Sequence, residues 1–236
     1  MDFTNKVAIV TGASQGLGVE IARQFAKNGA SVVLVARTYS KIKKLADEIV
    51  ASGGKALACA ADISKEEDVK NLVNQAVETF GTVDILVNNA AAHKAIPVKD
   101  LSLEDWNLQI NVNLTGTFLC SREVLKPMMA QKSGKIINIS SSSAKHFFPG
   151  FGAYAASKGG IVSFSQTLAE EVKDYNIQVN AIYLGLTNTE YTRSRMDVDP
   201  STMLQPDQVA DVIMFLASEK SSAIVGAAID VFGNRK

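Results

Sequence analysis

Residues 11–18 read Thr-Gly-Ala-Ser-Gln-Gly-Leu-Gly (TGASQGLG), and this stretch decides the fold. A β-branched apolar run at 7–10 comes directly before it, and apolar side chains recur at helical spacing over 16–28. Glycines between a strand and a helix permit a tight turn, and the first N–H groups of the helix are free to bind an anion. The stretch therefore predicts a strand, a turn with an anion site, and a helix.

The same alternation of apolar strands and amphipathic helices continues along the chain. We expect further strands at 31–35, 56–61, 84–87, 135–139, 177–181 and 227–231, and further helices at 40–51, 66–80, 103–131, 154–173 and 207–217. Strands that are apolar throughout and separated by helices indicate a parallel sheet that is covered on both faces. The predicted fold is α/β, a doubly wound, Rossmann-type αβα domain of three layers with a parallel sheet of about seven strands.

The 236 residues contain no linker, repeat or low-complexity segment, so one domain is predicted over residues 1–236. The least regular part is 185–206, which is rich in Thr, Ser, Asp and Pro. Because it follows the sixth strand, it would border the ligand crevice at the carboxyl edge of the sheet. We interpret it as a mobile loop on the substrate side, with a surface insertion as the alternative.

The 24 basic and 24 acidic residues leave a formal net charge of +0, which gives no electrostatic case for nucleic acid or an anionic membrane as partner. The N-terminus lacks the pattern of a signal peptide, and no apolar run is long enough to cross a bilayer. Cys59 and Cys120 lie in apolar surroundings without ligand spacing. We therefore expect two buried free thiols, no metal site and a reducing, cytoplasmic compartment.

The glycine turn has the logic of a dinucleotide site, because its backbone can approach a pyrophosphate in front of the helix N-terminus. Its spacing is G-x-x-x-G-x-G rather than G-x-G-x-x-G, and an ordinary turn with glycines for packing is the alternative. The residues that we assign to the dinucleotide here are Gly12, Ser14, Gln15, Gly16, Leu17 and Gly18.

The end of the second strand indicates which dinucleotide is bound. Ala36 offers no carboxylate to the adenosine ribose, and the Arg37 guanidinium can bind a 2′-phosphate through two hydrogen bonds. NADP(H) is therefore predicted in preference to NAD(H), with a solvated surface charge as the alternative for Arg37. Asp62 either accepts from the adenine amino group or caps the following helix. The remaining predicted cofactor residues are Thr38, Ile63, Asn89, Tyr154, Lys158, Gly185 and Thr187.

A tyrosine and a lysine open the predicted helix at 154–173. Tyr154 and Lys158 stand at i and i+4, so both point from one face of the helix. An ammonium beside a phenol lowers the tyrosine pKa from about 10, which prepares the phenol for proton transfer near neutral pH. Ser141, at the end of the fifth strand, can hydrogen-bond the same substrate oxygen. By itself the Y-x-x-x-K pattern also fits an exposed pair without function.

Together these motifs resemble the short-chain dehydrogenase/reductase family in its single-domain form, over nearly the whole chain. The resemblance rests on TGASQGLG at 11–18, NNAA at 88–91, Asn113, and Ser141 thirteen positions before Tyr154, with Lys158 after it. The chain departs from the family pattern at Ala91, where Gly is usual, and at Leu184, where Pro is usual.

The resemblance implies a catalytic set and its roles. Tyr154 would protonate the alkoxide that forms when a nicotinamide hydride reaches a carbonyl carbon, and Ser141 would polarise that carbonyl. Lys158 would lower the tyrosine pKa and hold the nicotinamide ribose, and Asn113 would place a water for a proton relay. The resemblance also implies a homodimer or homotetramer through the helices around 103–131 and 154–173.

The substrate is less well defined. The loop at 145–151 (KHFFPGF) carries Phe148 and Phe151 shortly before the tyrosine, and it either lines an apolar pocket or packs in the core. His93 and Ser143 are the polar candidates for substrate contact, although a histidine there is also an ordinary loop residue.

The sequence thus predicts NADPH-dependent reduction of a small-molecule ketone to a secondary alcohol. A 3-oxoacyl thioester is among the candidates, because the chain is similar to the family's 3-oxoacyl-(acyl-carrier-protein) reductases. An NAD(P)⁺-dependent alcohol or sugar dehydrogenase is the alternative within this class. A cofactor-binding sensor or scaffold without turnover is the alternative from another class.

Overall fold

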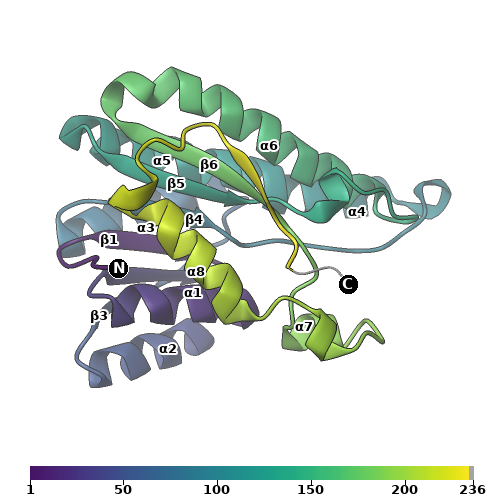
Figure 1. Cartoon of the computed structure of the whole chain (residues 1–236), viewed down its shortest axis with the longest axis horizontal. Helices are drawn as coiled ribbons and strands as arrows, with labels where there is room; N and C mark the ends of the chain where they lie inside the picture. Colours follow the sequence, from purple (N-terminus) through teal and green to yellow (C-terminus); the bar gives the residue numbers. More distant parts are fainter. Residues whose placement is uncertain (234–236) are drawn as a thin grey trace.

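Seven parallel strands form the centre of the computed structural model, which describes residues 1–233 (Figure 1). They lie in the order β3-β2-β1-β4-β5-β6-β7. Their bounds are β1 (Val7–Thr11), β2 (Ser31–Ala36), β3 (Lys55–Ala60), β4 (Ile85–Asn88), β5 (Gly134–Ile139), β6 (Ile177–Leu184) and β7 (Ala228–Val231). The winding direction reverses between β1 and β4, and doubly wound folds bind their ligands at the carboxyl ends of the strands at such a point.

Helices cover both faces of the sheet (Figure 1). One layer holds α1 (Gly16–Lys27), α2 (Tyr39–Ala51) and α8 (Pro206–Ala217), and the other holds α3 (Glu66–Phe80), α5 (Gly116–Gln131) and α6 (Gly152–Val172). In β1, Ala8 and Val10 pack into the first layer, and Val7 and Ile9 pack into the second. This strand is apolar throughout because both of its faces are buried. The predicted three-layer αβα fold with seven parallel strands is confirmed.

The helix predicted at 103–131 is interrupted. It consists of α4 (Leu103–Gln109), a π-helical stretch (Ile110–Thr115) and α5. A π-helical turn inserts an extra residue per turn and changes the direction of the side chains that follow it. Apolar spacing alone does not reveal this insertion, because the hydrophobic pattern continues on both sides.

The segment at 185–206 is more regular than predicted. It contains α7 (Glu190–Arg193) and a 3₁₀ turn (Pro200–Thr202). Backbone hydrogen bonds from Asn188 to Leu204 (2.8 Å) and from Leu204 to Leu186 (3.0 Å) fold the segment back on itself. These bonds join residues far apart in the segment, so local sequence patterns do not predict them.

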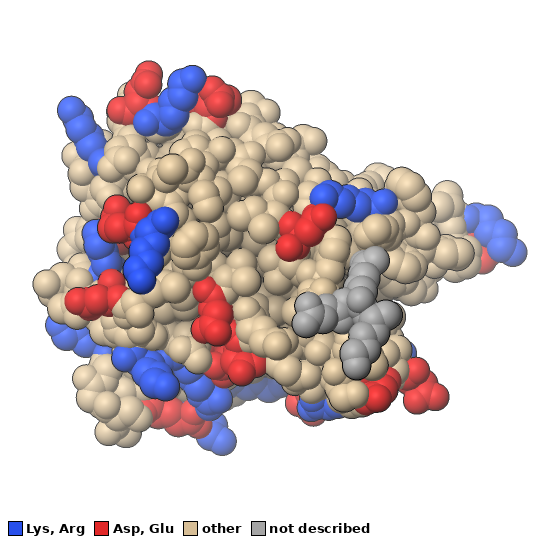
Figure 2. All heavy atoms as spheres, viewed as in Figure 1, with Lys and Arg blue, Asp and Glu red and all other residues tan. Residues whose placement is uncertain are grey.

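The surface carries charges of both signs, and the two cysteines are buried. Figure 2 shows acidic and basic side chains interspersed on one face of the molecule. Cys59 and Cys120 are buried and unpaired, as predicted, and burial raises their pKa to about 11 and about 12. Within residues 1–233, no helix is both long enough and apolar enough to cross a membrane. The same residues contain no group of three or more metal-ligating side chains.

Candidate active site

The glycine turn after β1 is held closely against the loop after β4. Gly12 has a φ of 71°, in the left-handed region, and a Cβ there would lie 2.8 Å from Asn89 Nδ2. At Gly18, in the first turn of α1, a Cβ would lie 2.3 Å from the carbonyl oxygen of Gly12. Asn89 Nδ2 donates to the Thr11 carbonyl at 2.8 Å. The turn therefore requires glycine at both positions, and the Asn89 side chain stabilises it through the hydrogen bond to the Thr11 carbonyl.

The two asparagines after β4 have separate roles. Asn88 Nδ2 donates across the sheet to Asn138 Oδ1 (2.8 Å) and to Ser121 Oγ (3.1 Å), so this side chain ties neighbouring elements together. Asn89 instead belongs to the glycine turn. Thr11, which we did not assign from the sequence, supports the same loop, because its hydroxyl accepts from the N–H groups of Asn89 and Ala90 at 3.0 Å. A threonine at a strand end carries no sequence signal for this role.

The N-terminus of α1 is open to an anion. Gln15 stands at the N-cap with extended backbone and no side-chain hydrogen bond, and the first turn of the helix carries no acidic residue. A Cβ at Gly16 would lie 3.3 Å from Thr189 Cγ2, so the 185–206 segment passes over this turn. Free helix N–H groups beside a glycine turn fit a pyrophosphate. These residues thus fit the dinucleotide that the sequence predicts.

The end of β2 provides an unpaired cation. Arg37 is exposed and makes no ion pair or hydrogen bond with any residue of the described chain. Asp62 Oδ1 accepts from the N–H and hydroxyl of Ser64 (3.1 and 2.7 Å), before α3 begins. Burial raises the pKa of Asp62, but the Ser64 hydrogen bonds and the charge of Arg37 outweigh it and leave this pKa below its usual value. Asp62 therefore shapes the turn before α3, and Arg37 is free to meet a phosphate.

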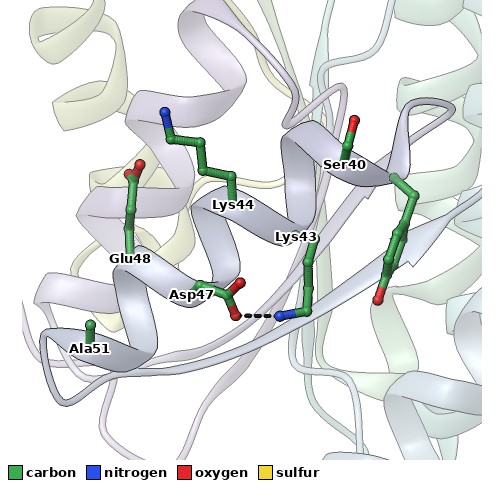
Figure 3. Close-up of a pocket in the computed structure, with 7 residues that line it drawn as sticks. Ser40, Lys43, Lys44, Asp47, Glu48 and Ala51 are labelled. Atoms are coloured by element: carbon green, nitrogen blue, oxygen red, sulfur yellow. Dashed lines mark hydrogen bonds and ion pairs between the residues drawn. The ribbon is translucent and has the colours of Figure 1, made fainter.

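A shallow groove runs along the outer side of α2 (Figure 3). Lys43 Nζ donates to Asp47 Oδ1 at 2.5 Å within it, and Glu48 on the same helix accepts from Arg23 of α1 at 2.8 Å. The groove contains none of the predicted catalytic residues. We assign no ligand to it.

Tyr154, Ser141 and Lys158 come together at the carboxyl ends of β5 and β6. Tyr154 lies in the first turn of α6, and Lys158 Nζ lies 5.7 Å from the centre of its ring. Burial raises the pKa of Tyr154 to about 12, against the lowering effect of a hydrogen bond with Ser141. The expected lowering of the tyrosine pKa is therefore wrong for this structure. The reason is burial, which is the largest effect on this phenol, while Lys158 Nζ donates to the Ile139 carbonyl at 2.7 Å.

Lys158 is the most deeply buried charge-bearing group of the site. Only 2% of the residue is exposed, and burial lowers its pKa to about 7. A lysine with such a pKa exchanges its proton near neutrality, where an ordinary lysine is fully charged. Lys158 can therefore both hold and release a proton beside Tyr154.

Asn113 is buried in the π-helical stretch. Its amide pairs with the backbone of Ala92 in both directions, accepting at 2.7 Å and donating at 2.9 Å, and it also donates to Ser157 Oγ at 3.0 Å. These contacts use the amide to position the loop after β4 and the start of α6. The water relay that the resemblance implies for Asn113 remains a prediction.

Three of the substrate candidates, His93, Phe148 and Phe151, form an aromatic group next to Tyr154, whereas Ser143 contacts Ser141. His93 packs against Tyr154, with ring centres 4.6 Å apart, and against Phe151 at the same distance. Phe148 contacts Phe151 at 5.5 Å and is 49% exposed, so this part of the loop borders the crevice instead of entering the core. Ser143 Oγ donates to Ser141 Oγ at 3.0 Å and thereby orients it.

Gly185 and Thr187 start the segment that passes over the crevice. The Gly185 N–H donates to the Val231 carbonyl at 2.9 Å, and Thr187 Oγ1 donates to the Gly185 carbonyl at 3.2 Å. Two residues of this segment that we did not assign from the sequence reach the site. Tyr191 Oη donates to the His93 carbonyl at 3.3 Å, and the Arg195 guanidinium stacks on the Tyr191 ring at 4.0 Å.

Comparison with known proteins decides the family. The family model described as short chain dehydrogenase matches residues 6–199. The chain belongs to the short-chain dehydrogenase family. This short-chain dehydrogenase is 37% identical over 243 residues to a 3-oxoacyl-[acyl-carrier-protein] reductase of Synechocystis sp., covering 98% of this chain and 97% of the relative.

Two further relatives show the range of substrates in this family. Glucose 1-dehydrogenase 2 of Bacillus subtilis is 39% identical over 252 residues, covering 98% of this chain and 95% of the relative. The crystal structure of an NAD⁺-bound xylitol dehydrogenase superposes with a TM-score of 0.92 at 27% identity, covering 99% of this chain and all of that one (100%). This short-chain dehydrogenase is therefore an oxidoreductase that acts on a CH–OH or C=O group.

Proposed function

We propose that this short-chain dehydrogenase uses NADPH to reduce a small-molecule ketone to a secondary alcohol. The observation that carries the proposal is the joint presence of two features at the carboxyl edge of the sheet. Ser141, Tyr154 and Lys158 meet at the strand ends, and the unpaired Arg37 stands at the end of β2 beyond the glycine turn. The similarity to a 3-oxoacyl-[acyl-carrier-protein] reductase supports the reductive direction and keeps 3-oxoacyl thioesters among the candidates.

The residues of the chain act on the oxygen of the substrate. When bound, the nicotinamide cofactor supplies the hydride for the carbonyl carbon. Ser141 and the Tyr154 hydroxyl hydrogen-bond the carbonyl oxygen, and Tyr154 donates its proton as negative charge builds up there. Lys158, with its pKa of about 7, returns a proton to the tyrosine. Asn113 holds the Ala92 loop and the start of α6, so that these groups stay in position.

The cofactor preference follows from charge at the end of β2. Arg37 is free to make two hydrogen bonds to a 2′-phosphate. Ala36 provides no carboxylate to repel it, and Thr38 lies beside it at the entrance to α2. NADP(H) is therefore favoured over NAD(H).

The second candidate is an NAD(P)⁺-dependent alcohol or sugar dehydrogenase that works in the oxidative direction. It is favoured by the close structural similarity to an NAD⁺-bound xylitol dehydrogenase and by the glucose dehydrogenase relative. Gln15 adds no positive charge to the glycine turn, and Asp62 lies close enough to Arg37 for the guanidinium to lower its pKa. Both features weaken the attraction for a 2′-phosphate.

A kinetic comparison of the two cofactors tests the proposal. With a panel of ketones and 3-oxoacyl thioesters, the wild-type protein should oxidise NADPH with a lower KM than NADH. Arg37→Ala should raise the KM for NADPH by about tenfold or more, since a charge-assisted contact is lost, and leave that for NADH nearly unchanged. Equal effects on both cofactors would remove the 2′-phosphate assignment. Tight cofactor binding with no turnover of any alcohol or ketone would favour a sensor or scaffold.

Assembly and location are part of the same proposal. We expect a homodimer or homotetramer through α5 and α6. Phe118 on α5 is 39% exposed, and its ring packs edge-to-face against Phe164 of α6 at 6.1 Å, so these helices share an apolar surface. The two buried free thiols fit a reducing, cytoplasmic compartment. Light scattering after gel filtration measures the mass, and a monomer would contradict the assembly.

A further inference from the structure

We propose that His93 and Arg195 select substrates that carry a carboxylate close to the reacting carbonyl, so that the substrate class is a short oxo acid. This inference rests on the proposed function and narrows its substrate. It favours a free oxo acid over a neutral ketone, ester or thioester. The two residues come from distant parts of the chain, the loop after β4 and the turn that follows α7. Tyr191 links them, because its hydroxyl donates to the His93 carbonyl and its ring carries the Arg195 guanidinium.

His93 carries a polar atom without a hydrogen bond, and its ring lies beside the ring of Tyr154. His93 Nε2 is buried and has no hydrogen-bond partner among residues 1–233. Buried polar atoms in proteins are nearly always hydrogen-bonded, so this exception beside the catalytic tyrosine points to a missing ligand atom. The ring lies edge-to-face with Tyr154 at 4.6 Å. The imidazole that carries Nε2 is therefore in direct contact with the ring whose hydroxyl would hold the substrate carbonyl.

Arg195, which Tyr191 connects to His93, is a cation without an ion-pair partner in the described part of the chain. Its guanidinium is held instead by stacking on the Tyr191 ring at 4.0 Å, and Tyr191 Oη reaches the His93 carbonyl at 3.3 Å. Burial lowers the pKa of His93, and the positive charge of Arg195 lowers it further. A carboxylate fits this pair, accepting from both.

The other cations near the crevice are already engaged. Lys145 pairs with Asp230 at 2.5 Å and lies over the Tyr183 ring. Lys158 donates to a backbone carbonyl at the base of the site. Among residues 1–233, Arg195 is thus a positive charge near Tyr154 that no carboxylate neutralises. Phe151 packs on the His93 ring and contacts Phe148, and these two rings suit a short apolar chain.

The experiment compares a 3-oxo acid with its methyl ester, both reduced with NADPH. The two probes share the carbonyl and the chain and differ in charge. Wild-type kcat/KM should be about tenfold or more higher for the acid, the size expected for a charge-assisted hydrogen bond. Arg195→Gln should remove most of this preference by lowering kcat/KM for the acid much more than for the ester.

Two further variants separate charge from structure. Arg193→Gln is the matched control, because Arg193 is also an arginine of this segment but donates to Asn188 Oδ1 at 2.6 Å, and the acid-to-ester ratio should be unchanged. His93→Phe keeps an aromatic ring against Tyr154 and removes Nε2. It should raise KM for the acid more than KM for the ester.

The outcomes distinguish this inference from the proposed function. Reduction of ketones by the wild type without preference for the acid, or equal loss on acid and ester in Arg195→Gln, overturns the inference and leaves the proposed function intact. Full activity in Tyr154→Phe overturns the proposed function and the inference with it. A preference for the acid that Arg195→Gln abolishes and Arg193→Gln keeps supports both.

Discussion

Replacing the buried lysine of the site should stabilise the protein while it abolishes activity. Burial lowers the pKa of Lys158 from 10.5 to about 7, so the charged form is disfavoured in the folded protein by roughly 4–5 kcal/mol. Lys158→Met removes this penalty and keeps a long, flexible chain in the same space. The variant loses the hydrogen bond to the Ile139 carbonyl, at a cost of about 1 kcal/mol. We expect a net gain of roughly 3 kcal/mol in the free energy of unfolding at pH 7.

The pH dependence of this gain has a definite sign. Between pH 7 and 10.5 the unfolded chain keeps the lysine proton and the folded protein releases it, so the stability of the wild type rises with pH. The slope is about 1.4 kcal/mol per pH unit, and the variant lacks it. The advantage of Lys158→Met should therefore shrink from roughly 3 kcal/mol at pH 7 to near zero at pH 9 and should be constant below pH 7.

Urea unfolding at a series of pH values measures the effect. Lys99→Met is the control, because the Lys99 side chain is 83% exposed, and its stability curve should run parallel to that of the wild type. Parallel curves for Lys158→Met and the wild type between pH 7 and 9 would refute the reasoning. They would mean that the lysine keeps an ordinary pKa in the folded protein.

Three other substitutions or treatments test the packing of the site and the core. Gly18→Ala should weaken cofactor binding about tenfold or more in calorimetric titration and destabilise the fold by about 1–3 kcal/mol, because its Cβ would meet a backbone oxygen at 2.3 Å. The control is Gly159→Ala, whose Cβ would have nothing within 4 Å and which should leave binding unchanged and stability unchanged or higher. Equal effects of the two substitutions would contradict this prediction. Asn138→Ala should cost about 1–3 kcal/mol in chemical unfolding, since it leaves buried partners unsatisfied, and a neutral result would show that this polar contact is dispensable. Cys59 and Cys120 should resist a thiol reagent at pH 8 until the protein unfolds, and rapid labelling of the native protein would show that they are accessible.

Most of the fold could be predicted because its elements are strongly periodic. Strands such as β1 and β2 are apolar on both faces, and the helices show clear one-sided patterns, so their positions agree with the prediction within a few residues. The spacing of Tyr154 and Lys158 also fixes their shared face on α6, whatever the tertiary structure.

The parts that could not be predicted depend on contacts between distant residues. Tyr191 and Arg195 reach the site because the 185–206 segment folds back on itself and meets the loop after β4. The hydrogen bond from Tyr191 to His93 joins residues that are 98 positions apart in the chain. The raised pKa of Tyr154 has the same origin. Its charged neighbour is visible in the sequence, but its burial is not, and burial has the larger effect.

The most direct test of the central claim is the rate of NADPH oxidation by the Tyr154→Phe variant with a ketone that the wild type reduces. Tyr154 is the proton donor in this account, and phenylalanine preserves its ring contacts with His93 and Phe151. The account predicts a loss of about 10²-fold or more in kcat, with NADPH binding by fluorescence titration nearly unchanged. A kcat equal to that of the wild type would contradict it.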